Sequence, residues 1–371
     1  MKLLITGGAG FIGSHVADAL LAAGHQVRVL DNLDPQVHGQ GGQWPGYLNP
    51  AVETQRGDVR NHDDVRAALE GCDVVIHLAA AVGVGQSMYE IERYCSVSVI
   101  GTAVLLEELI PLRDRIKKLI VASSMSIYGE GAYRDADGNV VSPTSRSIAQ
   151  LKQSQWELGD GQGRPLTPMP TPETKALRPD SIYAVNKRDQ EEMCLAFGRA
   201  YGVPALAFRM FNVYGARQAL SNPYTGVVAI FSARLLNGKP PLVFEDGLQR
   251  RDFVHVSDVA RAYVRAVECD GGDGSALNVG SGHCVTVLDI ARTTANVLGL
   301  AIEPEVTGSY RDGDIRHCFA DISRIESALG WKPSYSFEDG IRTLVSWLQG
   351  QQANDSVTQA MDDLKKRGLL K

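Results

Sequence analysis

A glycine-rich turn directly after a short apolar run constrains the fold more than any other feature of this chain. Residues 6–13 read TGGAGFIG and follow the apolar run Leu-Leu-Ile. In this pattern Gly7 permits a tight turn, Gly10 lets the backbone approach a pyrophosphate, and Gly13 lets a following helix pack closely on the strand. The sequence therefore predicts a strand, a turn and a helix whose first N–H groups face a bound anion.

Apolar runs alternate with helical patterns over the first part of the chain. The strands expected from these runs are 2–6, 26–30, 51–55, 74–78, 118–123 and 205–210. The expected helices are 11–23, 63–69, 91–110 and 181–201. This alternation is typical of an α/β protein whose parallel sheet is covered on both faces. We therefore predict a Rossmann-type doubly wound parallel sheet that binds ligands beyond the carboxyl ends of its strands.

The residues that follow these strands predict a dinucleotide site. Asp31 ends the second strand, where a carboxylate accepts hydrogen bonds from both hydroxyls of an adenosine ribose and repels a 2′-phosphate. Asp31 therefore favours NAD over NADP as the cofactor. The expected cofactor contacts are Gly7, Gly10, Phe11, Ile12, Gly13, Asp31, Asn32, Asp58, Val59, Leu78, Ala79 and Ala80, together with Tyr183 and Lys187.

Tyr183 and Lys187 lie four residues apart in the last of the expected helices, and so share one helix face. A free tyrosine titrates near pH ~10 and is a poor base at neutral pH. An ammonium one turn away would stabilise the phenolate and lower the pKa of the phenol. Ser124 lies at the end of the fifth expected strand and would bond to the same substrate oxygen; Ser123 and Ser126 are alternatives. Together these residues predict that a proton moves to Tyr183 while a hydride passes to NAD.

Composition excludes several other classes of function. A formal net charge of -6 and the lack of a basic cluster argue against a nucleic-acid partner. The 6 cysteines are scattered without a CxxC pair, so we expect reduced thiols in a cytoplasmic protein, without a metal site. Met1 leads directly into the first strand, which leaves no room for a signal peptide, and we expect no membrane-spanning run.

Arginines further along the chain are candidates for binding a diphosphate, because the guanidinium is planar and always charged. Arg251 and Arg311 are the predicted clamp, while Arg250 and Arg316 are expected to be surface or ion-pair residues. Asn212 follows the last expected strand, where it would bind a substrate phosphate or sugar hydroxyl. The expected substrate contacts are Ser87, Ser124, Asn212, Arg251 and Arg311.

The segment 129–179 interrupts the alternating pattern. It is polar, rich in Gly, Pro, Ser and Thr, and has almost no apolar periodicity. Structureless loops this long are usually functional lids or disordered excursions, and the sequence leaves both open. Because the segment lies between Ser124 and Tyr183, we expect it at the rim of the active site, as a wall or lid over the sugar or as a contact with a partner subunit.

The domain organisation follows from these features. Residues 1–210 form the predicted NAD-binding domain, with 252–280 returning to it. Residues 211–251 and 281–350 form a predicted smaller, mixed α/β C-terminal lobe that binds the substrate. The polar tail 351–371 is expected to be a peripheral helix.

Six phrases of the sequence together resemble the extended short-chain dehydrogenase/reductase family. They are TGGAGFIGSH, HLAA, SSMSIYG, YAVNK, FRMFNVYG and RRDFVHVSDVARA. The resemblance extends from Met1 to about Leu348 and is closest to nucleotide-sugar 4-epimerases, the group that contains UDP-galactose 4-epimerase. It implies that Ser124, Tyr183 and Lys187 are catalytic and that NAD stays bound.

Three further segments resemble the subgroup that contains dTDP-L-rhamnose 4-epimerase. These segments are 82–89, 221–226 and 244–247. A departure lies at Ser98, where the family often has Asn, and we expect the shorter side chain to reshape hydrogen bonding near the site. The resemblance also implies a homodimer in which the helices expected over 91–110 and 181–201 pair with a second subunit.

Related activities differ in two features that the sequence contains. Sugar 4,6-dehydratases of the family carry an acidic residue shortly after the Ser or Thr, whereas this chain has Met125 and Ser126. A net reductase would draw on NADPH, which Asp31 disfavours. A 4-epimerase needs no net redox change: it oxidises C4 to a ketone, lets the sugar rotate about its diphosphate linkage, and returns the hydride to the other face.

The resemblance therefore implies an NAD-dependent 4-epimerase of a nucleotide-diphosphate sugar. The substrate expected is a dTDP-6-deoxyhexose such as dTDP-L-rhamnose, or UDP-glucose and UDP-galactose. A nucleotide-sugar 4-ketoreductase or dehydrogenase is the first alternative, and a non-catalytic NAD-binding scaffold is the second.

Overall fold

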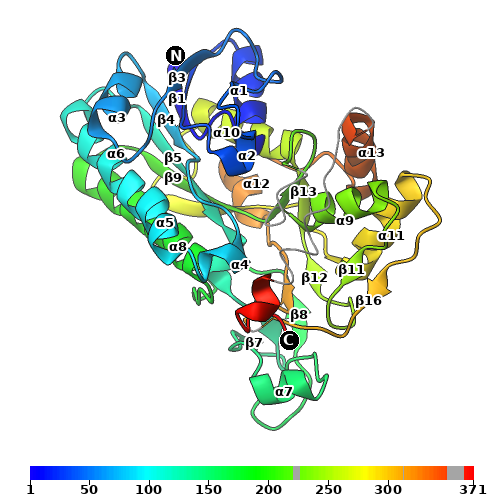
Figure 1. Ribbon diagram of the computed structural model, residues 1–371. Helices are drawn as coiled ribbons and strands as arrows, with labels where there is room; N and C mark the ends of the chain where they lie inside the picture. The colour runs from blue at the N-terminus through cyan, green and yellow to red at the C-terminus, as the bar shows by residue number, and fades with distance from the viewer. Residues whose placement is uncertain (220–225, 312, 349–362) are drawn as a thin grey trace.

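A seven-stranded parallel sheet forms the centre of the larger lobe (Figure 1). The computed structural model describes residues 1–219, 226–311, 313–348 and 363–371. In spatial order the strands of the sheet are β14 (Ser275–Val279), β9 (Ala205–Met210), β5 (Lys118–Ser124), β4 (Val74–His77), β1 (Lys2–Thr6), β2 (Gln26–Asp31) and β3 (Glu53–Arg56). All of the pairings within this sheet are parallel, so the predicted Rossmann-type doubly wound sheet is confirmed.

Helices cover both faces of the sheet, because alternate residues along each strand point to opposite sides. Leu3 and Ile5 pack on one face and Leu4 on the other. The helices on the first face are α1 (Phe11–Ala22), α10 (Val256–Glu268) and α12 (Ser323–Leu329). Those on the second face are α3 (His62–Leu69), α6 (Gly101–Leu109) and α8 (Ile182–Tyr201).

The helix expected over 91–110 contains a π-helical turn. Its parts are α5 (Ile91–Cys95), the π-helical residues Ser96–Ile100, and α6. By length and composition Ile91–Leu112 is apolar enough to cross a membrane, and its most apolar 18-residue window has a mean hydropathy of 1.7. The buried core helix of a soluble protein passes the same test, and α6 contacts α3 and α8 over the sheet.

The smaller lobe is built from short strands and helices around its own core (Figure 1). Its strands are β10 (Asn212–Tyr214), β11 (Leu242–Val243), β12 (Arg250–Arg251), β13 (Phe253–His255), β15 (Val285–Thr286), β16 (Glu305–Val306) and β17 (His317–Cys318). Its helices are α9 (Val227–Leu236), α11 (Val287–Val297) and α13 (Phe337–Leu348). Phe231, Ile290 and Leu344, one from each helix, meet in this core and join the helices to one another.

The segment 129–179 is ordered, which corrects the expectation of a structureless loop. It contains β6 (Ala132–Arg134), β7 (Val140–Val141), β8 (Thr167–Met169) and the helix α7 (Ile148–Lys152). The strands form an antiparallel sheet in the order β7-β6-β8. Tyr133, Leu158 and Leu166 make a small core of their own, so the segment is a miniature folded unit.

The described end of the chain, residues 363–371, packs on the body of the protein, and the peripheral helix expected over 351–371 stays a prediction. Leu364 and Leu370 are buried, and the backbone of Lys371 exchanges two hydrogen bonds with that of Tyr310. Residues 363–371, red in Figure 1, lie beside α4 (Val84–Ser87) at the junction of the two lobes. Residues 351–362 of the expected tail lie outside the described residues.

Candidate active site

A cavity of about 650 Å³ opens beyond the carboxyl ends of the sheet strands and is lined by both lobes. This is the place at which doubly wound folds bind ligands. The predicted residues that line it are Gly7, Gly10, Phe11, Ile12, Gly13, Asp31, Asn32, Asp58, Val59, Leu78, Ala79, Ala80, Ser124, Tyr183, Lys187 and Asn212. Ser87, Arg251 and Arg311 are the predicted site residues that do not line it.

The glycines of the first turn leave space for a group that approaches the backbone. Gly7 has a φ of +68°, and a Cβ placed there would lie 2.9 Å from the Cα of Ala79. A Cβ on Gly13 would lie 2.6 Å from the carbonyl oxygen of Gly7, so the helix approaches the turn too closely for any side chain. A Cβ on Gly10 meets only that carbonyl, at 3.4 Å, so a substituent there would fill part of the cavity. The turn is therefore shaped for a pyrophosphate.

Asp31 ends β2 with its carboxylate already partly used by the backbone. Its Oδ2 accepts from the N–H of Ala9 at 3.0 Å and its Oδ1 from that of Leu33 at 2.9 Å. A carboxylate has about four acceptor positions, so about two remain for ribose hydroxyls. His38 Nε2 lies 3.7 Å from Oδ1, and Tyr47 donates to the carbonyl of Ala9. The sequence analysis missed His38 and Tyr47, which also line the cavity, because neither follows a strand directly.

Ser124 and Tyr183 both line the cavity and lie close enough for the serine hydroxyl to act on the phenol. Ser124 comes from the end of β5 and Tyr183 from the first turn of α8, which Ser181 caps by accepting from the N–H of Ala184. Burial raises the pKa of the Tyr183 phenol, and the nearby Ser124 hydroxyl lowers it in part. The low pKa expected of this tyrosine therefore does not come from the protein pocket by itself, and needs the positive charges that face the phenol when the site is filled.

Lys187 lies one turn further along α8 and is buried with its partners. Its Nζ donates to the carbonyl of Ala122 and to Oε1 of Gln190, each at 3.0 Å. Burial lowers the pKa of Lys187 to about 8, since an ammonium loses hydration in this place. The lysine therefore carries its charge close to neutral pH, at the wall of the cavity.

The structure separates the three serines that the sequence left as alternatives. Ser123 donates to Oε2 of Glu191 at 2.6 Å, two turns along α8 from Tyr183, and its hydroxyl is therefore already engaged. Ser126 donates to Oγ of Ser124 at 2.9 Å, so it supports that hydroxyl. Of the three, Ser124 is the one that acts on the pKa of the Tyr183 phenol, and its catalytic role stays a prediction.

Asn212 lines the cavity with a buried carboxamide oxygen that has no partner among the described residues. The same holds for Oε1 of Gln218, which the sequence analysis did not name. Buried polar atoms without a partner are rare in folded proteins, because leaving one unpaired costs about 1–3 kcal/mol. Both oxygens are therefore suited to accept hydrogen bonds from a ligand.

The two arginines of the predicted clamp do not line the cavity and are held by a carboxylate. Arg311 bonds to Oδ2 of Asp314 at 3.1 Å, and Arg251 lies 3.8 Å from Oδ1 of the same residue. Although burial opposes it, the charges of Arg311 and Arg251 hold the pKa of Asp314 below its usual range. Ser87 accepts from the N–H of Tyr183 and donates to Val84, so its hydroxyl supports the start of α8. Substrate contacts by these three predicted residues stay predictions.

The carboxylates that line the cavity in the described ranges all lie at its adenosine end. They are Asp31, Asp34 and Asp58, which follow β2 and β3. Met125 and Ser126 occupy the positions after Ser124, and Met125 packs against Tyr128 in a small apolar cluster. Near Tyr183 the cavity therefore offers phenol, hydroxyl and ammonium groups without a carboxylate.

Comparison with known proteins supports the same assignment. A model of the NAD dependent epimerase/dehydratase family matches residues 3–148 and 154–280. The chain belongs to this family. It is 39% identical over 349 residues to a dTDP-L-rhamnose 4-epimerase of Burkholderia thailandensis, covering 94% of each chain. It is 32% identical over 360 residues to a UDP-glucose 4-epimerase of Mycolicibacterium smegmatis, covering 95% of this chain and 99% of the relative.

Solved structures of family members have the same fold. The UDP-glucose 4-epimerase of Thermotoga maritima, solved with UDP-glucose, has a TM-score of 0.77 at 32% identity, covering 94% of this chain and 99% of its own. That of Thermus thermophilus, solved with NAD, has a TM-score of 0.75 at 30% identity, with 95% and 100% covered. NAD is the cofactor of this epimerase/dehydratase family member, as Asp31 and the glycine cradle predict.

Proposed function

We propose that this family member is a nucleotide-sugar 4-epimerase. The observation that carries the proposal is the convergence of Ser124, Tyr183 and Lys187 on the cavity that the glycine turn and Asp31 share. Its curated relatives at 39% and 32% identity are 4-epimerases, and this chain spans almost all of each. A non-catalytic scaffold would have no need to keep three reactive side chains in one buried arrangement.

The residues of the chain divide the chemistry at C4 between them. Tyr183 removes the proton of the 4-hydroxyl, Ser124 bonds to the same oxygen, and Lys187 favours the phenolate by its charge. NAD, held by the glycine turn and Asp31, would supply the acceptor and donor for the hydride of C4. Between these steps the 4-keto sugar turns over within the cavity, and Tyr183 gives the proton back to the oxygen formed on the other face. The net reaction changes stereochemistry at C4 and consumes no oxidant.

The site lacks the groups that the related reactions need. A 4,6-dehydratase removes a proton from C5 and expels water from C6, for which family members use a carboxylate near the serine. The carboxylates that line the described part of this cavity are at its adenosine end. A reductase that uses NADPH would place its 2′-phosphate beside Asp31, which repels it.

A dTDP-6-deoxyhexose such as dTDP-L-rhamnose is the substrate that we propose first, with UDP-glucose and UDP-galactose second. The relative at 39% identity acts on dTDP-L-rhamnose, whereas those at 32% and 30% are named for UDP-glucose. Arg251, Arg311 and Asn212 are the proposed contacts to the diphosphate and sugar. Of the phrases that resemble the rhamnose subgroup, most of 221–226 lies outside the described residues.

A cytoplasmic homodimer is the proposed form of the enzyme. Ile91 and Ile100 are 49% and 53% exposed and lie on the long helix that contains α5 and α6, and Val185 on α8 is 38% exposed. The two helices also contact each other through α5 and α8. Apolar side chains on adjoining helices are suited to bury one another across a two-fold axis.

A panel of nucleotide sugars tests the proposed activity. The purified protein is incubated with dTDP-L-rhamnose, UDP-glucose, UDP-galactose and GDP-sugars, and the configuration at C4 is read by NMR. We expect a dTDP- or UDP-sugar to reach an equilibrium of two epimers without net change in NADH absorbance. Tyr183→Phe should abolish this conversion and keep NAD bound. A stoichiometric change in NADH would show a dehydrogenase or ketoreductase instead.

A further inference from the structure

A buried glutamine, Gln190, accepts a hydrogen bond from the ammonium of Lys187 at the wall of the active site. Gln190 is 0% exposed and lies on α8 three residues after the lysine. Its Oε1 accepts from Lys187 Nζ at 3.0 Å, and its Nε2 donates to Oγ1 of Thr102 at 2.9 Å and to the carbonyl of Ala79 at 3.3 Å. Every polar atom of this side chain therefore has a partner, and the partners come from α8, from α6 and from the loop after β4.

The chemistry of the neighbours allows only one orientation of the amide. An ammonium can only donate hydrogen bonds, so the atom of Gln190 that faces Lys187 has to be the oxygen. The amide nitrogen then faces Ala79 O, which can only accept, and Thr102 Oγ1. A side chain without both an acceptor and a donor cannot replace glutamine here without leaving a buried polar atom unpaired.

The network continues away from the cavity into the π-helical turn. Thr102 donates to the carbonyl of Ser98 at 2.6 Å, and its Oγ1 lies 2.9 Å from Nε2 of His77. His77 Nδ1 lies 2.7 Å from Oγ1 of Thr6 at the end of β1. All of these groups are buried, so they hold Gln190 rigidly from the side opposite Lys187.

We propose that Gln190 is a positioning residue for the reaction, which keeps the Lys187 ammonium directed at the cavity through a hydrogen-bond network with Thr102 and His77. The inference rests on the proposed function in that it assigns Tyr183 as the base that Lys187 serves. Two acceptors fix the lysine: Ala122 O, which belongs to the central strand β5, and Oε1 of Gln190. Without the second acceptor, the ammonium loses half of its protein contacts and its fixed direction.

The titratable side chains that face Lys187 are uncharged at neutral pH, and Gln190 is the uncharged side chain that bonds to its ammonium. His77 faces it from β4 and Cys194 from α8, and burial keeps both uncharged at neutral pH by lowering the pKa of His77 to about 3 and raising that of Cys194 to about 12. Tyr94 on α5 faces Tyr183, and burial raises the pKa of Tyr94. Glu191, one turn after Lys187 on α8, bonds to Arg209 and Ser123 instead. Among the described residues no ion pair joins Lys187 to a carboxylate, so its charge is available to stabilise a Tyr183 phenolate.

Gln190→Met tests the proposal, because methionine keeps the shape and removes both hydrogen bonds. The kcat of epimerisation should fall about tenfold. The acid limb of the kcat/KM profile should move to higher pH by about one unit, because a less ordered Lys187 stabilises the phenolate less. NAD content should stay near that of the parent protein. Gln249→Met is the matched control: Gln249 is 4% exposed, donates to Phe244 O in the smaller lobe, and lies outside the site.

A second variant separates positioning from simple loss of stability. Thr102→Val removes one of the acceptors of the Gln190 amide and leaves Ala79 O in place. Alone it should therefore move the acid limb of the kcat/KM profile in the same direction by a smaller amount, and in the Gln190→Met background it should add no further shift. Ionisation of Tyr183 is also followed directly by the near-ultraviolet tyrosinate absorbance of each NAD-loaded protein against its Tyr183→Phe partner. A protein that turns over no nucleotide sugar would contradict the proposed function, while this titration would still test Gln190. Equal thermal destabilisation of both methionine variants with an unmoved titration would overturn the inference.

Discussion

At the scale of single residues, identical side chains acquire different roles from the direction in which a strand presents them. Ser123 and Ser124 are neighbours at the end of β5, so their side chains point to opposite faces of the sheet. Ser123 meets the buried pair of Glu191 and Arg209, whereas Ser124 meets Tyr183. The sequence left both open because it shows two adjacent serines without the register that separates them.

This difference gives a prediction with an internal control. Ser124→Ala should lower kcat about a hundredfold, because the hydroxyl bonds to the oxygen that changes charge during reaction. Ser123→Ala should leave kcat within about twofold and lower thermal stability, since it removes a hydrogen bond to a buried carboxylate. Steady-state kinetics and thermal unfolding of the two variants check this. Equal loss of kcat in both would show that the strand end acts as a whole.

A second prediction at this scale concerns acid. Burial, and the charge of Lys187, lower the pKa of His77 to about 3. An unfolded histidine binds a proton near pH ~6.5 and the folded one does not, so this residue costs stability as the pH falls below that value. Between pH 7 and pH 5 its share of the loss is about 2 kcal/mol.

The measurement compares urea unfolding at pH 7 and pH 5. His77→Gln, which cannot titrate, should lose about 2 kcal/mol less between these two pH values than the parent protein. The matched control is His283→Gln, since His283 is exposed. Parallel losses in the parent and both variants would mean that other groups control the response to acid.

At the scale of elements, the sequence predicted strands whose residues are consecutive in the chain. It did not predict the folded unit of 129–179, whose core residues are far apart in the chain. The bounds of β1 and β9 agree exactly with the expected ranges, because buried parallel strands are continuous apolar runs. The segment 129–179 has strands of two or three residues, and its core residues Tyr133, Leu158 and Leu166 are far apart in the chain. Such a unit leaves no periodic pattern.

Of the two roles expected for this segment, only a wall over the substrate can be compared with the structure, and a contact with a partner subunit stays a prediction. Within the described residues none of 129–179 lines the main cavity, so the expected wall over the substrate is not formed there. Arg146 instead bonds to both carboxylate oxygens of Glu245 at 2.8 Å, and Glu157 bonds to Arg316 and His317. The segment is therefore attached to the smaller lobe by the buried pair of Arg146 and Glu245 and by the exposed Glu157, which pairs with the buried Arg316.

Breaking this attachment should destabilise the enzyme. The side chains of Arg146 and Glu245 are each 1% exposed, and removing one partner of a buried pair costs about 3 kcal/mol. Arg146→Met should therefore lower the free energy of unfolding by about that amount and open the segment to limited proteolysis. Arg164→Met is the control, because Arg164 pairs with Asp137 and Asp160 at the surface of the same segment. Equal protection from protease in both variants would contradict the role of Arg146.

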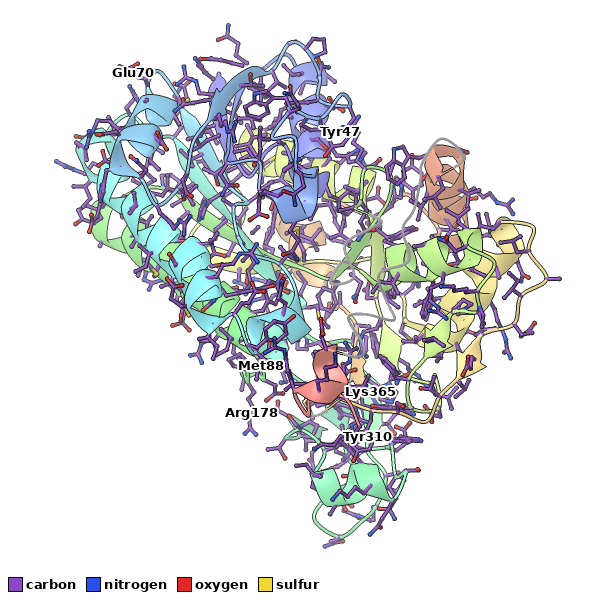
Figure 2. The ribbon with its side chains drawn as sticks, in the orientation of Figure 1. Tyr47, Glu70, Met88, Arg178, Tyr310 and Lys365 are labelled. Atoms are coloured by element: carbon purple, nitrogen blue, oxygen red, sulfur yellow. The ribbon has the colours of Figure 1, made fainter. Side chains whose placement is uncertain are left out.

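At the scale of the whole molecule, the end of the chain joins the lobes that enclose the cavity. Leu364 packs against α4 of the larger lobe, where a Cβ on Gly85 would lie 3.3 Å from its side chain. Residues 370–371 pair with Tyr310 and Arg311 of the smaller lobe. Figure 2 shows Lys365 on this segment, in the space between Met88 and Tyr310. The sequence could not predict this contact, because the segment 363–371 is short and mostly polar. Its sequence contains no pattern that identifies the residues it packs against.

Loss of this connection should weaken the binding of the sugar nucleotide more than that of NAD. Arg311 belongs to the predicted diphosphate clamp, and its backbone pairs with Leu370, so a chain without residues 363–371 holds this arginine less firmly. We expect KM for the nucleotide sugar to rise about tenfold, which corresponds to about 1.4 kcal/mol. The content of NAD should change little, since its predicted contacts lie on the other side of the cavity.

Two point variants make this prediction specific to the contact. Leu364→Ala removes a buried apolar side chain and should raise KM in the same direction as the deletion, because it loosens the segment from α4. Lys366→Ala changes an exposed residue of the same turn and should leave KM unaltered. Both are measured by initial rates over a range of nucleotide-sugar concentrations, with NAD content determined on each preparation. The prediction is contradicted if deletion of 363–371 and Leu364→Ala both lower stability but leave KM unchanged. In that case the segment joins the lobes without affecting substrate binding, and the position of Arg311 does not depend on it.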